Sequence, residues 1–150
     1  SAVGLAKNPW HVARTRASMT GAVLADAIVR ADLRDVVLVG FSLGGRVMAE
    51  AAEALATRDE EPRILEMHLL GAAVGTRRDF HAMESAVSGT IYNYFSTNDK
   101  VLGYLYTAAE AGSKAIGQKG IDKAPKNVKN VNVSRQVKAH DDHLRLVDLK

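Results

Sequence analysis

The chain has 150 residues, 47% of them hydrophobic and 25% charged, which is the composition of one soluble globular domain. Its net charge is only +3, from 20 basic and 17 acidic residues, so the charge gives no reason to expect nucleic-acid binding. The absence of cysteine excludes disulfides, a thiolate nucleophile and Cys-ligated metals. No apolar run approaches the ~20 residues of a transmembrane helix, so we expect a chain that is soluble as given. The sequence does not predict the compartment: the chain could act in the cytoplasm or be delivered as an effector domain.

The first predicted element is an amphipathic helix from Trp10 to about Arg30. Asn8 can accept hydrogen bonds from the amides of the first turn, and Pro9 is tolerated at the first helical position. Apolar residues at helical spacing predict one buried face, made of Val12, Met19, Val23, Leu24, Ala27 and Ile28.

A buried strand and a second helix are predicted next. Residues 36–39 are all apolar and do not alternate with polar residues, which is typical of a strand covered by helices on both faces. The strand ends at Gly40. From Val47 to Leu55 apolar residues keep helical spacing, and the abundant alanine predicts a helix packed closely on a sheet.

The alternation of strands and helices continues to the end of the chain. Further strands are predicted at 64–70, 90–95 and 127–133. A short helix is predicted near Thr76, with Thr76 and Asp79 in a capping arrangement. Further helices are predicted at 101–110, 113–116 and 141–149. The last of these has Leu144, Val147 and Leu149 available for packing. This order predicts right-handed crossovers and a three-layer α/β/α sandwich with a mostly parallel sheet.

A stretch rich in lysine lies before the last predicted strand. Its basic residues are Lys114, Lys119, Lys123, Lys126 and Lys129. A solvated loop is the simpler interpretation, and a contact with anionic lipid or phosphate is the alternative.

The sequence Gly40-Phe41-Ser42-Leu43-Gly44 has the G-x-S-x-G pattern of a nucleophile elbow. The pattern alone is a weak signal, but here it falls between a buried strand and an Ala-rich helix, as that turn requires. Small residues are expected two positions before and after the serine, because the turn is strained, and Gly45 adds room. One alternative is a glycine-rich turn whose serine does no chemistry. A phosphate-binding loop is disfavoured, because Arg46 stands where that loop needs lysine.

A serine nucleophile needs a base and an acid, which in this architecture follow in later loops. Asp99 comes directly after the third strand and fits the acid, although it could instead only cap the next helix. His140 follows the last strand and is favoured as the base, with His143 as the alternative. The remaining histidines are expected to be structural: His11, His68 and His81.

These residues predict acyl transfer without a cofactor or metal. His140 would take the proton of Ser42 and return it to the leaving alcohol, while Asp99 would hold the imidazole. The amide of Leu43 would supply one oxyanion donor.

Several segments resemble the α/β-hydrolase family DUF726, which includes the TMCO4-like proteins. The similar segments are 39–47, 69–74, 88–106 and 130–133, followed by His140, so that the resemblance covers nearly all of the chain. It implies Ser42, Asp99 and His140 as the triad of a lipase-like or esterase-like enzyme that acts on an acyl ester or lipid. Relatives carry Gly-His and an aromatic residue three positions on, where this chain has Ala139, His140 and His143.

The chain is expected to be one partial α/β-hydrolase domain, because a full hydrolase has several strands before the elbow. We therefore expect another domain, another chain or a second copy to cover the edge of the sheet beside the elbow strand and to give the second oxyanion donor. A hydrolase-like scaffold that binds a protein partner through this open edge, without catalysis, is the alternative function.

Overall fold

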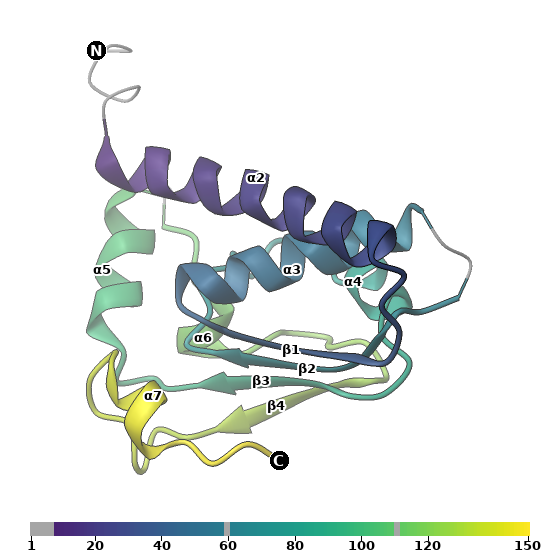
Figure 1. Ribbon diagram of the computed structural model, residues 1–150. Helices are drawn as coiled ribbons and strands as arrows, with labels where there is room; N and C mark the ends of the chain where they lie inside the picture. The colour runs from purple at the N-terminus through teal and green to yellow at the C-terminus, as the bar shows by residue number, and fades with distance from the viewer. Residues whose placement is uncertain (1–7, 59–60, 110–111) are drawn as a thin grey trace.

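A computed structural model describes residues 8–58, 61–109 and 112–150. At its centre four parallel strands lie in the order β1-β2-β3-β4 (Figure 1). They are β1 (Val36–Phe41), β2 (Ile64–Leu70), β3 (Ile91–Phe95) and β4 (Val128–Asn132). The predicted parallel sheet is confirmed. Because each strand pairs with the next one in the chain, β1 and β4 form the two edges of the described sheet.

Most helices lie on one face of the sheet (Figure 1). Helix α3 (Leu43–Ala56) packs on β1 and β2, and α2 (Pro9–Arg30) lies over α3. Two short helices, α4 (His81–Ser85) and α6 (Ile116–Lys119), complete this layer, and their Met83 and Ile116 belong to the main core. Helix α5 (Lys100–Ala109) stands at the end of the sheet where the strands end (Figure 1).

The opposite face of the sheet is covered only in part. Helix α7 (Asp142–Leu146) lies on this side (Figure 1), beside a smaller apolar cluster that contains Leu70, Tyr94, Val133 and Val137. These elements make the third layer of the predicted α/β/α sandwich. Beyond them, Val37 and Val39 of β1 are 51% and 49% exposed.

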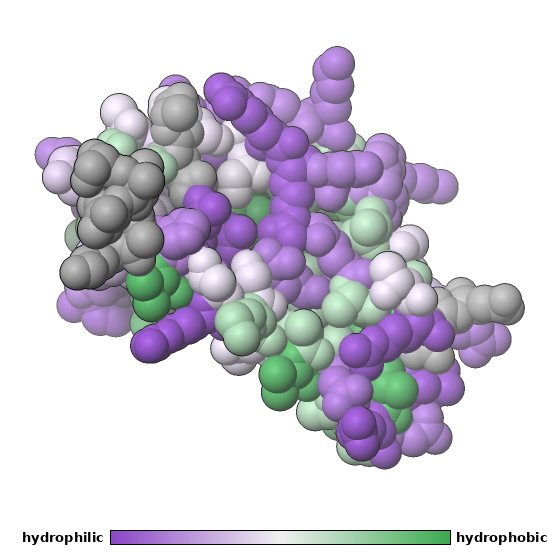
Figure 2. Space-filling view, turned by 90° about the horizontal axis from the view of Figure 1, so that it is seen from above, coloured by the Kyte–Doolittle hydropathy of each residue, from purple (hydrophilic) through white to green (hydrophobic). Residues whose placement is uncertain are grey.

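The buried face of α2 differs from the prediction. The residues that it buries are Ala17, Gly21, Ala25 and Ile28, whereas Met19 and Val23 are 65% and 68% exposed. Small residues face α3 because the two helices pack very closely: a Cβ on Gly21 would lie 2.5 Å from the Cβ of Glu50. Figure 2 shows the surface above α2, where hydrophilic side chains predominate and apolar ones form small groups.

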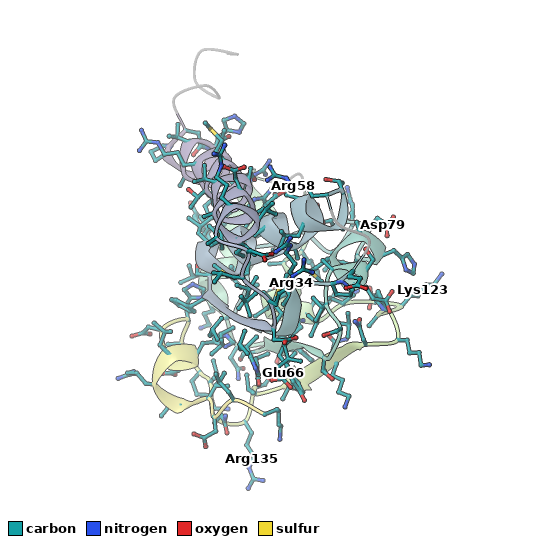
Figure 3. The ribbon with its side chains drawn as sticks, turned by 45° about the vertical axis from the view of Figure 1, so that its right-hand side comes forward. Arg34, Arg58, Glu66, Asp79, Lys123 and Arg135 are labelled. Atoms are coloured by element: carbon teal, nitrogen blue, oxygen red, sulfur yellow. The ribbon has the colours of Figure 1, made fainter. Side chains whose placement is uncertain are left out.

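The start of α2 is as predicted, since the side chain of Asn8 accepts a hydrogen bond from the Trp10 amide at 2.9 Å. Among the described residues, no helix combines the length and the apolar character that a bilayer crossing demands. The five lysines of the basic stretch are all exposed, and Figure 3 shows Lys123 projecting from the molecule.

Three predicted helix boundaries were wrong. The helix expected near Thr76 begins at His81. The segment before it is not helical, because Gly75 pairs with Ala115 in an antiparallel bridge and residues 76–80 form a turn and a short connection between this bridge and the helix. Asp79, just before α4 in Figure 3, accepts a hydrogen bond from the His81 amide at 3.0 Å. The same bridge uses Ala115, so the helix expected at 113–116 starts at Ile116.

The last helix is shorter than predicted. It ends at Leu146, because Val147 has an extended backbone. Leu144 and Leu149 are 62% and 47% exposed, and only Val147 of the three expected residues packs on the smaller cluster.

Candidate functional site

Ser42 is the single residue between the end of β1 and the start of α3, and its backbone is strained. Its φ is 55° and its ψ is −120°, a conformation that costs a residue with a side chain of order 1–3 kcal/mol. Backbone hydrogen bonds hold it on both sides, since its amide donates to Leu70 and its carbonyl accepts from Ala73, each at 3.0 Å. The serine hydroxyl is thereby fixed at the carboxyl edge of the parallel sheet.

The glycines around Ser42 have unequal roles. A Cβ on Gly40 would lie 2.4 Å from the carbonyl oxygen of Gly44, so β1 and α3 touch through bare backbone. A Cβ on Gly45 would lie 2.7 Å from the Cβ of Ala72. The expectation that Gly44 must itself be small was wrong, because a Cβ there would meet no described atom within 4 Å.

This asymmetry gives a first prediction. We expect Gly40→Ala to destabilise the chain by about 1–3 kcal/mol, because the new methyl group overlaps backbone that cannot move aside. Gly44→Ala is the matched control and should be neutral or stabilising by about 0.4–1 kcal/mol, since alanine favours helix and its methyl group has room. Urea unfolding of both variants measures the difference, and equal losses of stability would contradict it.

The side chains of Ser42, His140 and Asp99 form one continuous hydrogen-bonded chain. His140 Nδ1 donates to Asp99 Oδ2 at 2.6 Å, and His140 Nε2 lies 2.9 Å from Ser42 Oγ. Phe41 packs against the imidazole with ring centroids 4.7 Å apart. The three residues come from the ends of β1 and β3 and from the segment after β4.

The carboxylate of Asp99 makes contacts that fit both of the roles considered for it. Its Oδ1 accepts a hydrogen bond from the Leu102 amide at 3.0 Å and so caps α5, while Oδ2 faces His140. The residue is 0% exposed. Burial opposes ionisation, but the hydrogen bond from His140, the neighbouring imidazole of His143 and the hydrogen bond from the Leu102 amide outweigh it and lower the pKa of Asp99 to about 2.

The lowered pKa of Asp99 makes a prediction about acid stability. Because an unfolded aspartate has a pKa of about 3.9, the ionised carboxylate stabilises the folded chain above about pH 4. That contribution is lost as the pH falls through about 2, the pKa in the folded chain. Asp99→Asn should therefore lose less free energy of unfolding between about pH 4 and pH 2 than the unsubstituted chain.

The control for this measurement is Asp141→Asn, which removes an exposed carboxylate from the same region. Chemical denaturation at several pH values should give this control the pH dependence of the unsubstituted chain. If the free energy of unfolding of Asp99→Asn fell with pH as steeply as that of the unsubstituted chain, the carboxylate of Asp99 would not have the lowered pKa described here.

His143, the alternative base, contacts Asp99 instead of the serine. Its ring is fully buried and its Nε2 lies 3.5 Å from Asp99 Oδ2, while neither ring nitrogen has a hydrogen-bond partner among the described residues. The ring also fills the space above Gly71, where a Cβ would lie 2.7 Å from His143 Cδ2. The two imidazoles thus meet the same carboxylate oxygen from different sides.

Three polar residues that the sequence analysis did not single out hold the loops of Asp99 and His140. Ser96 Oγ donates to the Val137 carbonyl at 2.8 Å, and Asn98 donates to the Ser134 carbonyl at 2.8 Å. Asp142 Oδ2 accepts from the amides of residues 138 and 139 at 3.0 and 2.9 Å. The polar runs 96–98 and 140–143 were the available signals, since short polar side chains often hold loop backbone.

The other histidines lie away from these residues. His68 is buried in β2, where its ring stacks on Tyr92 and its Nδ1 lies 3.0 Å from the Tyr94 hydroxyl. His11 and His81 are exposed. In the described part of the chain, no group of three or more His, Asp or Glu side chains could hold a metal ion.

Fold and geometry together define a three-layer α/β/α protein whose candidate site lies at the carboxyl edge of a parallel sheet, where such sheets bind their ligands. The chain belongs to the family DUF726, described as proteins of unknown function, whose model matches residues 2–149. No solved structure gives a significant match.

Curated relatives come from fungi, a plant and a nematode. The chain is 36% identical over 140 residues to the uncharacterized membrane protein C6F6.13c of Schizosaccharomyces pombe, covering 91% of this chain and 18% of that protein. It is 32% identical over 136 residues to the probable lipase MIL1 of Saccharomyces cerevisiae, covering 89% and 13%. It is 34% identical over 139 residues to the transmembrane and coiled-coil domain-containing protein STS1 of Oryza sativa, covering 90% and 21%. The chain thus spans less than a quarter of each of these proteins.

Proposed function

We propose that the chain is a serine hydrolase that cleaves carboxylic esters through an acyl-enzyme. The observation that carries the proposal is the unbroken hydrogen-bonded chain from Asp99 through His140 to Ser42, with distances of 2.6 and 2.9 Å. Similarity to a probable lipase suggests a hydrolase as well. The strained backbone of Ser42 adds support, because strain of this kind gathers at reactive residues.

In the proposed reaction His140 is the general base. It takes the proton of Ser42 as the hydroxyl oxygen attacks the ester carbonyl, and it returns that proton to the leaving alcohol. Asp99 keeps the proton of His140 on Nδ1, so that Nε2 can accept, and its negative charge stabilises the imidazolium. Water then attacks the acyl-enzyme by the same route and frees the acid.

The negative oxygen of the tetrahedral intermediate needs hydrogen-bond donors. Leu43 is the first residue of α3, so its amide has no acceptor within the helix, and the helix dipole favours negative charge there. We assign this amide one oxyanion contact. Gly40 contributes by allowing β1 to touch the backbone of Gly44 in the first turn of α3, which fixes the direction of the Leu43 amide.

The second oxyanion donor and a cover for the edge strand are proposed to come from another domain, another chain or a second copy. Strand β1 is an edge of the described sheet, and its Val37 and Val39 side chains are about half exposed. An exposed apolar edge strand invites pairing with further backbone. This feature also favours the second candidate function, a scaffold that binds a protein through the same edge without catalysis.

Labelling with a fluorophosphonate probe separates the two functions. We expect the probe to label the unsubstituted chain and not Ser42→Ala, because only an activated serine attacks phosphorus quickly. The matched control is Ser85→Ala, which removes the hydroxyl of an exposed serine in α4. Mass spectrometry of the adduct reads the outcome. If Ser42→Ala were labelled as strongly as the unsubstituted chain, the enzyme proposal would be contradicted. If neither the unsubstituted chain nor any variant were labelled, the scaffold function would be favoured.

The roles of the two late histidines give another prediction. We expect His140→Gln to lower the hydrolysis of a p-nitrophenyl ester by at least ~1,000-fold, as Ser42→Ala does, because the base is lost. His143→Gln should keep the rate within about tenfold, because its ring touches the acid and not the nucleophile. Initial rates at saturating ester measure both. The reverse order of effects would make His143 the base.

A further inference from the structure

A cavity of about 390 Å³ opens beside the start of α3 and is unusually rich in arginine. Four separate parts of the chain form its walls: α2, α3, the segment between β2 and α4, and α5 with the residues after it. The lining residues are Arg14, Arg46, Arg77, Arg78, Tyr106, Gly75 and Ser113. We call it the arginine cavity.

The charges around the arginine cavity are unequal. Arg78 contacts two carboxylates behind the cavity wall, Glu53 at 2.6 Å and Glu50 at 2.8 Å. The guanidinium groups of Arg46, Arg77 and Arg78 thus outnumber these two carboxylates, so that these described residues carry a net positive charge. A small anion that entered would gain from this field.

Arg46 is poorly matched by acceptors from the chain. Its Nε donates to Ser18 at 3.1 Å and its Nη1 to the Ala73 carbonyl at 3.4 Å, while its Nη2 lies 3.6 Å from Glu50. Burial lowers the pKa of Arg46, and the nearby charges of Arg14 and Arg78 act in the same direction. An anion in the cavity would offset both effects.

Tyr106 supplies an independent observation. The residue is 2% exposed, and its buried hydroxyl makes no well-aligned hydrogen bond with the described residues, although the guanidinium of Arg46 lies near it. A buried hydroxyl is almost always paired in folded proteins, so this one is available to donate to a group that enters the cavity. A phenol can donate to an anion while guanidinium groups hold its charge.

We propose that the arginine cavity binds the phosphate group of a phosphorylated small molecule or of a lipid headgroup. Guanidinium groups match phosphate oxygens in pairs, and the donors here converge from separate elements, as a tetrahedral anion requires. The site is distinct from Ser42 and does not depend on the proposed hydrolysis. It is nevertheless mechanically linked to the elbow, because the Arg46 side chain donates to Ala73, whose amide donates to Ser42.

Binding of inorganic phosphate, measured by calorimetry at constant ionic strength, tests the proposal. We expect Arg77→Ala to weaken binding about tenfold or more, through loss of a charge-assisted contact, and Tyr106→Phe about fivefold, through loss of the hydroxyl alone. Arg77 is exposed, so its removal should leave the fold intact. The control is Arg135→Ala, which removes an exposed arginine of equal charge near α7 (Figure 3) and should bind as the unsubstituted chain does.

Vesicles separate the two sources of phosphate. Phosphatidylcholine vesicles with phosphatidic acid should sediment the chain, and Arg77→Ala should reduce this, if the ligand is a headgroup. Phosphate binding without vesicle binding would indicate a soluble ligand. Equal losses in Arg77→Ala and Arg135→Ala would mean diffuse surface charge and overturn the proposal, as would the absence of both phosphate and vesicle binding.

Discussion

The carboxylate of Asp99 is the contact on which the candidate site depends. One oxygen caps α5 and the other receives His140, so a single fully buried side chain fixes both a helix and an imidazole. Its negative charge would be costly in this environment without those donors. The local fold and the site are therefore joined through one residue, and a change that disturbs the carboxylate should disturb both.

Parallel strands explain how distant residues meet. Ser42 and His140 are 98 positions apart, and His140 and Asp99 are 41 positions apart, yet all three follow strands of one sheet. Because the strands run in the same direction, their carboxyl ends share an edge, and each connection returns the chain to the opposite edge so that the next strand ends beside the previous one. Short polar side chains then tie these loops together, as Ser96 does with the Val137 carbonyl.

The sequence predicted the elements of the site better than the surfaces of its helices. Continuous apolar runs marked the buried strands, and the positions after them marked Ser42, Asp99 and His140. The buried face of α2 could not be predicted from hydropathy. Gly21 faces α3 because only a residue without a side chain fits there, while the apolar side chains of Met19 and Val23 are exposed. Hydropathy carries no information on how closely a partner helix approaches. The contact of His143 with Asp99 depends likewise on tertiary packing that no local pattern records.

Close packing and open surface lie on opposite sides of β1, and this division has a consequence for the site. On the side of α3, Gly40, Gly45 and Ala72 bring backbone into direct contact and hold the strained Ser42 without free space. On the other side, Val37 and Val39 remain half exposed. Since the interactions that fix Ser42, His140 and Asp99 come from the described chain itself, an element that covered the exposed face or the edge of β1 would add donors and binding surface around a site already in place. It would not need to rearrange that site, because close-packed backbone resists small displacements.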